Sequence, residues 1–402
     1  MVEIWPNKAK NEGMRMGFDI VNRFPDPAWL QDVREKLSRK MPYCIRKAQE
    51  VDFIPYTTEN GQFKPTDINW WTNGFWPAMM WQMYRMTGEK IYQEEAERTE
   101  RMLDEALRNF KKLDHDMGFL WLIQSGVHYQ LDKNQDSYDR TLFVANMLAG
   151  RFNPNGFIRA WNNWDPSTDR TGWAIVDCMM NLPLLYWASE MTGDPRYRLI
   201  AMAHADTTMK YFVRDDGSCN HIVIFDPETG AFLDNPGGQG YESGSSWSRG
   251  QSWALYGFVL SYLHTGKQEY LDTAKRVANY FISQCASDWL PRCDFRQPAE
   301  PELRDNAAGN IAACGLLELA RVLPELEAQS YYDAAVKILM AQEKDAADWT
   351  EDVPAIFRKC TSAWHDLPGR HITMDYGDYF FTEAIGKLMG ESLLFWYPNR
   401  GD

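Results

Sequence analysis

Two aspartates, Asp116 and Asp177, lie where carboxyl groups that carry out acid/base chemistry are often found. Apolar and aromatic residues dominate their segments, 114–119 and 175–185. A carboxyl group that loses hydration has a raised pKa and can hold a proton near neutral pH. Two such groups facing one pocket meet the requirement of acid/base catalysis on sugars. Alternatively, both aspartates begin helices and accept hydrogen bonds from backbone N–H groups there.

A second group of candidate residues lies in the glycine-rich stretch 219–253. Glycine allows the backbone to approach a ligand closely. His221, Gln239, Arg249 and Trp253 are the residue types that would hold a water, a hydroxyl, a carboxylate and the face of a sugar ring. We therefore expect this stretch to form part of a binding pocket.

Trp71 is a further candidate, because the segments 71–76 and 247–253 resemble each other. In both, a tryptophan followed by Thr or Ser precedes a predicted helix. The hydroxyl is expected to cap that helix, and the tryptophan is expected to lie at the mouth of the pocket. The alternative is a structural cap beside a core tryptophan.

His115, between two aspartates, is another candidate for substrate binding. It could also be a metal ligand. However, the sequence has no H-E-x-x-H motif and no second group of ligands that would complete a site. We therefore expect no metal.

These residues must be positioned by a helical scaffold, because the chain repeats one helical hairpin. The junctions at 86–92, 191–197 and 264–270 each place Thr-Gly between an apolar helix and an amphipathic one. Glycine at such a stop supplies the left-handed cap. Repeated hairpins bury a continuous core when they close into a ring. The sequence therefore predicts an all-α, (α/α)6 barrel of six helical hairpins, with the site where the inner helices begin.

The predicted barrel is a single domain, residues 27–402, after an N-terminal extension, residues 1–26. Inner helices are expected at 75–86, 178–191, 251–264 and 309–322. Their outer partners are expected at 89–112, 195–213, 267–284 and 330–344. Further segments at 27–50, 118–150 and 378–395 supply the remaining helices of the six hairpins.

Composition limits the possible partners and compartments. The net charge of −14 disfavours nucleic acid and anionic membranes, and no apolar run is long enough to span a bilayer. The seven cysteines form no C-x-x-C pair, which indicates reduced, buried thiols, as in the cytoplasm. No signal peptide is evident, so we expect a cytoplasmic protein, or a periplasmic one if a leader had been removed. The 17 tryptophans suit sugar ligands.

The chain resembles the unsaturated glucuronyl hydrolases of glycoside hydrolase family 88 from about residue 65 to 397. The order and spacing of the motifs agree, including the interval between Asp116 and Asp177. The matching segments are W-T-N-G-F-W at 71–76, L-D-H-D-M-G-F-L at 113–120, A-W…D-P…G…D-C-M-M-N-L-P-L-L-Y-W-A across 160–188, F-D-P-E-T-G at 225–230, S-S-W-S-R-G-Q-S-W at 245–253, R-D-N-A-A at 304–308, A-C-G-L-L-E at 313–318 and Y-G-D-Y-F-F-T-E-A at 376–384.

The resemblance implies removal of a 4,5-unsaturated uronic acid from the non-reducing end of oligosaccharides that polysaccharide lyases produce. The implied route is hydration of the vinyl ether. Asp177 matches the general acid/base, and Asp116 matches a second carboxylate that orients the substrate. The matching pocket residues are His221, Gln239, Arg249 and Trp253. The implied partner is an unsaturated oligosaccharide, without a cofactor, and the protein is expected to be a monomer or homodimer.

Two departures from the family pattern concern substrate contacts. Asn73 stands where some members have Asp. The loop 364–373 lacks the Ser- and Lys-bearing pattern of members that act on sulfated glycosaminoglycans, although Arg370 and His371 could replace it. Sulfation of the substrate therefore stays open.

Two rival functions remain. The unsaturated rhamnogalacturonyl hydrolases share the barrel and one catalytic Asp, but the family lacks the H-D-x-G-F segment present at 115–119. The second rival is a non-catalytic, sugar-binding helical barrel. The presence of both Asp116 and Asp177 argues against it.

Overall fold

The computed structural model describes residues 18–163, 167–393 and 396. Residues 1–17, 164–166, 394–395 and 397–402 lie outside this description. They include most of the predicted N-terminal extension and the end of the predicted segment 378–395. The expectation about a signal peptide also concerns residues outside this description.

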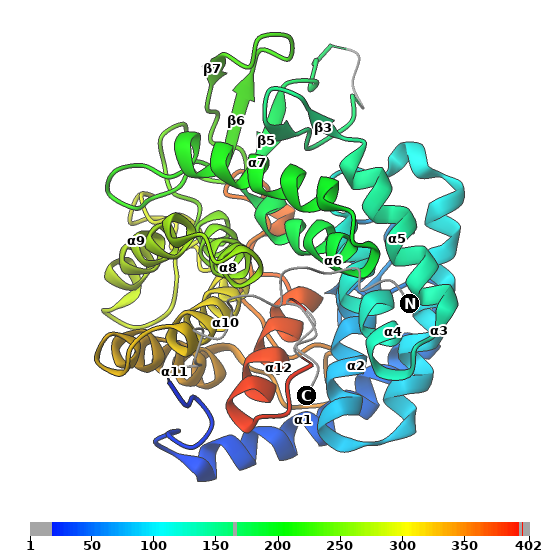
Figure 1. The fold of residues 1–402 in the computed structure, drawn as a ribbon. Helices are drawn as coiled ribbons and strands as arrows, with labels where there is room; N and C mark the ends of the chain where they lie inside the picture. Colours follow the sequence, from blue (N-terminus) through cyan, green and yellow to red (C-terminus); the bar gives the residue numbers. More distant parts are fainter. Residues whose placement is uncertain (1–17, 164–166, 394–395, 397–402) are drawn as a thin grey trace.

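Six helical segments form a closed inner ring (Figure 1). Each contacts the next along the chain, and the last contacts the first. In order they are α2 (Phe75–Thr87), η2 (Gly118–Gly126), α6 (Leu182–Thr192), α8 (Ser248–Thr265), α10 (Asn306–Val322) and α12 (Asp375–Met389).

Six outer helices pack against this ring, one for each inner segment, which confirms the predicted (α/α)6 barrel. The outer helix α1 pairs with α12, so the two ends of the chain form the sixth hairpin (Figure 1). Phe18 and Ile20, within the predicted extension, are also buried in the core. Paired with the inner segments in the same order, the outer helices are α3 (Lys90–Arg108), α5 (Gln135–Ala149), α7 (Pro195–Tyr211), α9 (Gln268–Cys285), α11 (Glu325–Ala346) and α1 (Pro27–Gln49).

The glycine stops predicted between inner and outer helices are present. Gly88, Gly193 and Gly266 have φ values of 73°, 73° and 68°, and each N–H donates to a carbonyl four residues earlier. Glycine adopts this left-handed conformation without the steric cost that a Cβ atom would add. These caps set the sharp turn from each inner helix to its outer partner.

The predicted helical segment 118–150 supplies the second hairpin. It is divided into η2, which is a π-helix, α4 (Val127–Asp132) and α5. The break falls at Lys133, whose φ is 62°. The division turns one long segment into an inner and an outer helix, and thereby completes the second hairpin.

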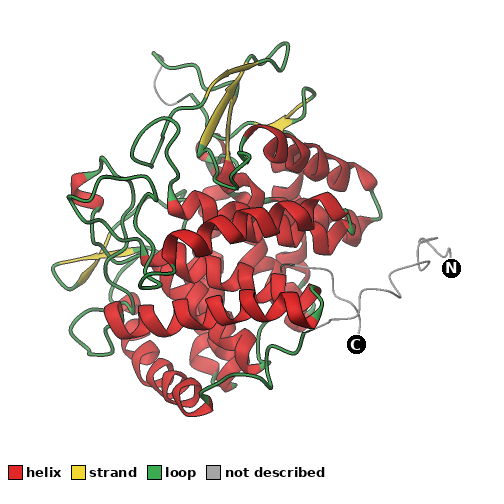
Figure 2. Ribbon diagram, turned by 90° about the vertical axis from the view of Figure 1, so that its left-hand side faces the viewer, coloured by secondary structure: helices red, strands yellow, loops and turns green. Residues whose placement is uncertain are grey.

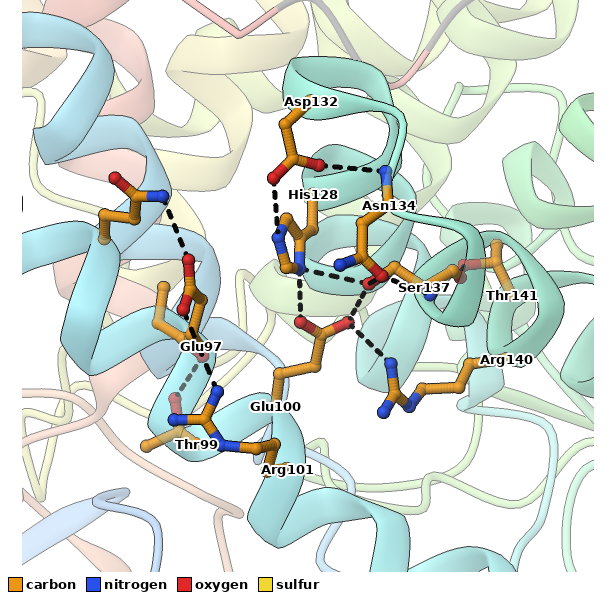
Figure 3. A network of polar contacts seen from close by, with 12 residues as sticks. Glu97, Thr99, Glu100, Arg101, His128, Asp132, Asn134, Ser137, Arg140 and Thr141 are labelled. Atoms are coloured by element: carbon orange, nitrogen blue, oxygen red, sulfur yellow. Dashed lines mark hydrogen bonds and ion pairs between the residues drawn. The ribbon is translucent and has the colours of Figure 1, made fainter.

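A network of polar contacts fixes the outer layer beside η2 (Figure 3). Glu100 of α3 accepts from Ser137 of α5 at 2.7 Å, and its other oxygen lies 2.6 Å from Nδ1 of His128 in α4. Nε2 of the same histidine lies 3.2 Å from Asp132. Three helices are therefore tied together through one buried carboxylate.

Short strands, which were not predicted, lie on one side of the helical ring together with the long loops (Figure 2). The three-stranded sheet is antiparallel, in the order β5-β6-β7. Its register pairs Ile175 with Ile222 and therefore brings the following Asp177 beside His221. The strands are β1 (Thr57–Glu59), β2 (Gln62–Lys64), β3 (Phe152–Asn153), β4 (Phe157–Ile158), β5 (Trp173–Ile175), β6 (Ile222–Phe225) and β7 (Phe232–Asp234).

All seven cysteines are free and buried, as the sequence predicted. Within the described part of the chain, no helix has both the length and the apolar character needed to cross a bilayer.

Candidate active site

A cavity of about 610 Å³ opens where the inner helices begin, which is the predicted place. Asp116 and Asp177 both line it, although only 6% and 7% of their surfaces are exposed. Their remaining exposure is therefore to this cavity, which we call the acidic cavity. The other residues on its wall are Asp67, Asn69, Trp70, Trp71, Lys111, Lys112, Asp114, Trp161, Asn162, Asn163, Ile175, His221, Gly238 and Gln239.

Asp177 lies in the short 3-10 helix η3 (Val176–Met180), directly after β5. Val176 donates its N–H to the carbonyl of His221 at 3.0 Å and extends the pairing of β5 with β6. Nε2 of His221 consequently lies 3.5 Å from Oδ1 of Asp177. The sheet, rather than a helix, brings these two side chains together.

The proton on the His221 ring can be assigned from its other partner. The backbone N–H of Gln239 donates to Nδ1 at 3.0 Å, so Nδ1 acts as the acceptor. In a neutral imidazole the other nitrogen then carries the hydrogen. Nε2–H of His221 is therefore a donor directed at Asp177 or at a water molecule between the two groups.

Gly238 makes this arrangement possible. A Cβ atom at this position would lie 2.0 Å from Nδ1 of His221, and the φ of +61° also favours glycine. The loop can approach the imidazole only because no side chain is present there. Glycine in the stretch 219–253 was expected to admit a ligand, whereas Gly238 admits the side chain of His221.

Asp116 is held from two sides. Its backbone N–H donates to Oδ1 of Asp114 at 3.1 Å, and its own Oδ1 accepts from Nδ2 of Asn181 at 3.1 Å. Burial, followed by the negative charges of Asp114 and Asp177, raises the pKa of the Asp116 carboxyl well above its usual range. Burial also raises the pKa of Asp114 to about 6. Asp116 can therefore keep a proton near neutral pH.

His115 lies behind Asp116 rather than on the wall of the cavity. It is fully buried, and its Nε2 is 3.4 Å from Oδ2 of Asp116. Burial lowers its pKa well below the usual range, so the ring is neutral. Among the described residues, His115, Asp114 and Asp116 could offer three ligand atoms to a metal ion. Metal binding requires deprotonated carboxylates, and the raised pKa of Asp116 opposes its deprotonation.

Arg249 does not present a free positive charge. Its Nη1 lies 2.5 Å from Oδ2 of Asp305, and both side chains are fully buried. Nη1 and Nη2 also donate to the carbonyls of Thr361 and Ser362, at 3.0 and 2.7 Å. Nε has no hydrogen-bond partner among the described atoms. The guanidinium therefore braces the 361–362 segment. Nε is itself buried, so the second N–H of Nη2 is the donor left for a ligand.

Arg249 lines a second cavity of about 620 Å³, which we call the adjoining cavity. The two cavities share Trp70, Trp71 and Gln239 as wall residues. Gln239 also donates from Nε2 to the carbonyl of Ser362 at 2.8 Å. The predicted residues His221, Gln239, Arg249 and Trp71 are therefore brought together around two neighbouring spaces.

Three sequence-based expectations need correction. Trp253 is fully buried against Phe119 and Phe380 and lines neither cavity. The predicted hydroxyl caps are wrong. Helix α2 has Gly74 at its N-cap position and therefore no side-chain cap. Only glycine fits there, because a Cβ atom would lie 1.9 Å from the carbonyl oxygen of Phe119. Ser248 is inside α8 and donates to the carbonyl of Cys293 instead.

The two aspartates do not cap the starts of helices, which was the alternative interpretation of the sequence. Asp116 accepts from the side chain of Asn181, and η3 has no side-chain cap, although Asp177 lies in its first turn. Asn181, one helical turn after Asp177, is a site residue that the sequence patterns did not predict. These patterns also did not predict several wall residues, namely Trp70, Trp161, Asn162 and Asn163.

Comparison with known proteins identifies the family. The model of Glycosyl Hydrolase Family 88 matches residues 45–284. The chain belongs to this family. A curated unsaturated glucuronyl hydrolase of Bacillus sp. (strain GL1) is 36% identical over 358 residues, which cover 87% of this chain and 94% of that protein. An unsaturated chondroitin disaccharide hydrolase of Streptococcus pyogenes serotype M1 is 32% identical over 86% of this chain and 88% of that protein.

Solved structures of family 88 members share the fold. The crystal structure of the unsaturated glucuronyl hydrolase from Bacillus sp. GL1 matches with a TM-score of 0.85 and 34% identity, over 92% of this chain and all (100%) of that chain. An unsaturated glucuronyl hydrolase from Streptococcus agalactiae matches with a TM-score of 0.83 and 28% identity, over 90% and 91% of the two chains. This family 88 chain is therefore a glycosidase built on a helical barrel.

Proposed function

We propose that this protein removes a 4,5-unsaturated uronic acid from the non-reducing end of oligosaccharides that polysaccharide lyases produce. Its relatives are named unsaturated glucuronyl hydrolases and unsaturated chondroitin disaccharide hydrolases. The observation that carries the proposal is the acidic cavity. The buried carboxyls of Asp116 and Asp177 both line it, and Nε2 of His221 lies 3.5 Å from Asp177.

The reaction begins with proton transfer from Asp177 to C4 of the C4=C5 double bond. Water adds at C5, and Asp177 then takes up a proton from that water, so it acts as acid and base in turn. His221, 3.5 Å away, is suited to orient the carboxyl or the water. The hemiketal formed at C5 opens to a ketone, and the hemiacetal left at C1 expels the shortened sugar. The net co-reactant is one water molecule.

The remaining site residues bind the substrate. Asp116 holds sugar hydroxyls, Trp71 offers a ring face, and Gln239 lies where both cavities meet. Arg249 lines the adjoining cavity and receives the substrate carboxylate through the second N–H of Nη2. A charged donor makes a stronger hydrogen bond to a carboxylate than a neutral donor does. His115 and Trp253 support these residues from behind.

The test is loss of the ultraviolet absorbance of the C4=C5 bond on incubation with unsaturated chondroitin, heparin and pectin disaccharides. Turnover of the glycosaminoglycan disaccharides is the expected result. Turnover of the pectin disaccharide alone would favour a rhamnogalacturonyl hydrolase instead. Binding without turnover of any of the three would favour a non-catalytic barrel.

A further inference from the structure

Asn181 belongs to the segment of Asp177 and contacts the segment of Asp116. It is fully buried, one helical turn after Asp177. Its Oδ1 accepts the backbone N–H of Phe119 at 2.9 Å. A backbone N–H can only donate, so the atom that faces Phe119 must be the amide oxygen. This contact fixes the orientation of the whole side-chain amide.

The other end of the amide must then be Nδ2, which can only donate. It lies 3.1 Å from Oδ1 of Asp116 and 3.5 Å from the backbone carbonyl of Asp177. Oδ1 of Asp116 is therefore an acceptor, whatever the protonation state of that carboxyl. A single side chain of the Asp177 segment thus contacts both the peptide of Phe119 and the carboxyl of Asp116.

The position of a proton on Asp116 follows. The hydroxyl oxygen of a protonated carboxyl is a poor acceptor, so a proton on Asp116 belongs on Oδ2. Oδ2 is the oxygen that lies 3.4 Å from Nε2 of the neutral His115. The two oxygens of Asp116 therefore have different roles.

The backbone is shaped to admit Asn181. A Cβ atom at Gly118 would lie 2.8 Å from both Cα and Oδ1 of Asn181. The H-D-M-G-F segment can thus approach Asn181 only because residue 118 is glycine. The contact between the two segments depends on a specific pair of residue types.

We propose that Asn181 is a positioning residue of the reaction, which holds Asp116 with Oδ1 as acceptor and leaves Oδ2 to exchange a proton or bind a substrate hydroxyl. The proposal deepens the proposed function and rests on it. Burial and neighbouring charges act to raise the pKa of Asp116, whereas the hydrogen bond from Asn181 acts to lower it. Loss of this donor therefore has a defined direction.

The test compares the pH–rate profiles of Asn181→Ala and Asn181→Asp with those of wild type and Asp116→Asn. We expect kcat to fall about tenfold in Asn181→Ala, with a smaller change in KM. The limb of the pH–rate profile that is missing in Asp116→Asn reports the titration of Asp116. This limb should move to higher pH in Asn181→Ala. It should move further in Asn181→Asp, because that change places a second negative charge beside Asp116. A limb that does not move in either variant would overturn the proposal.

Asn310→Ala is the matched control, because Asn310 is also fully buried, in α10, and donates to the carbonyl of Gly377 at 3.0 Å. Its loss should cost stability without a shift of the limb, and an equal shift in this control would also overturn the proposal. Asn181→Asp is isosteric, so it keeps the test decisive if the alanine variant fails to fold.

A carbon-detected NMR titration of the Asp116 carboxyl in the unliganded protein separates this proposal from the proposed function. If wild type processes no unsaturated sugar, the proposed function fails, but the titration still decides the role of Asn181. An upward shift in Asn181→Ala supports it, and an unchanged titration overturns it.

Discussion

Nε2 of His221 lies 3.5 Å from Oδ1 of Asp177, and the N–H of Gln239 occupies the other ring nitrogen at 3.0 Å. The imidazole therefore directs an N–H donor at the carboxyl that we assign to proton transfer. The arrangement depends on the pairing of β5 with β6 and on a loop without a side chain at Gly238.

Gly238→Ala should impair catalysis without unfolding the protein. The new Cβ would lie 2.0 Å from Nδ1 of His221, so the imidazole must move away from Asp177. We expect kcat to fall about 10- to 100-fold, less than the roughly 10²–10⁴-fold contribution of an acid/base group, because Asp177 itself is retained. Gly244→Ala is the control, since this glycine also has a positive φ, of +76°, but a Cβ there meets nothing within 4 Å. Equal losses of kcat in both variants would show that backbone strain, rather than His221, is responsible.

Arg249→Ala should weaken substrate binding and also destabilise the fold. It removes a donor to the substrate carboxylate, and we expect KM to rise about tenfold. It also leaves the buried Asp305 unpaired, which typically costs about 3–5 kcal/mol of unfolding free energy. Arg249→Lys should raise KM less, because the positive charge remains.

The double variant Arg249→Ala/Asp305→Asn separates these two effects. Urea denaturation should recover part of the lost stability, because the unpaired carboxylate has gone, while KM stays high. Recovery of KM along with stability would contradict the assignment of Arg249 to the substrate.

Asp116→Asn should lower kcat heavily and raise KM more than Asp177→Asn does. The amide keeps the shape of the side chain, but it cannot exchange the proton that the raised pKa of Asp116 allows it to hold. Steady-state kinetics across pH provide the measurement. A weakened binding constant with an unchanged pH profile would reduce Asp116 to a group that only positions the substrate.

The stability of the outer layer should depend on pH through His128. Burial acts to lower its pKa, but the hydrogen bond and charge of Glu100 outweigh this and raise the pKa above its usual range. When folding raises the pKa of a histidine, the resulting stabilisation is fully present below the ordinary pKa of about 6.5. This stabilisation is lost as the pH rises through the pKa of the folded state. His128→Asn should therefore destabilise the protein by about 1–3 kcal/mol at low pH, and by less at high pH.

Urea denaturation at about pH 6 and pH 9 would measure this difference. His365→Asn is the control, since His365 is exposed and its Nε2 contacts only the carbonyl of Tyr241 among the described residues. A stability deficit in His128→Asn that is the same at both pH values would contradict the account.

The sequence predicted the parts of this protein that local patterns encode. Thr-Gly stops mark the turns at Gly88, Gly193 and Gly266, because the left-handed cap is a local requirement. The apolar surroundings of Asp116 and Asp177 also indicated buried carboxyls. The inner ring follows from these turns and from the apolar faces of the helices.

Other features depend on contacts that are distant in the sequence. The sequence suggested that Arg249 is a free cation, but it pairs with Asp305, which directly precedes the inner helix α10. The sequence suggested that Trp253 lines the pocket, but the inner ring of helices buries it completely. The pairing of β5 with β6 could not be predicted, because strands this short show little sequence periodicity. Asn181 could have been found from its spacing of one helical turn after Asp177, had the opposing Gly118 been considered with it.

The rate of the Asp177→Asn variant tests the central claim most directly. The change is isosteric and removes only the transferable proton, so binding of an unsaturated disaccharide, measured by calorimetry, should persist. The loss of C4=C5 absorbance should slow by at least about 10²- to 10⁴-fold. A variant that binds the disaccharide and keeps more than about a tenth of the wild-type rate would contradict the assignment of Asp177 as the acid.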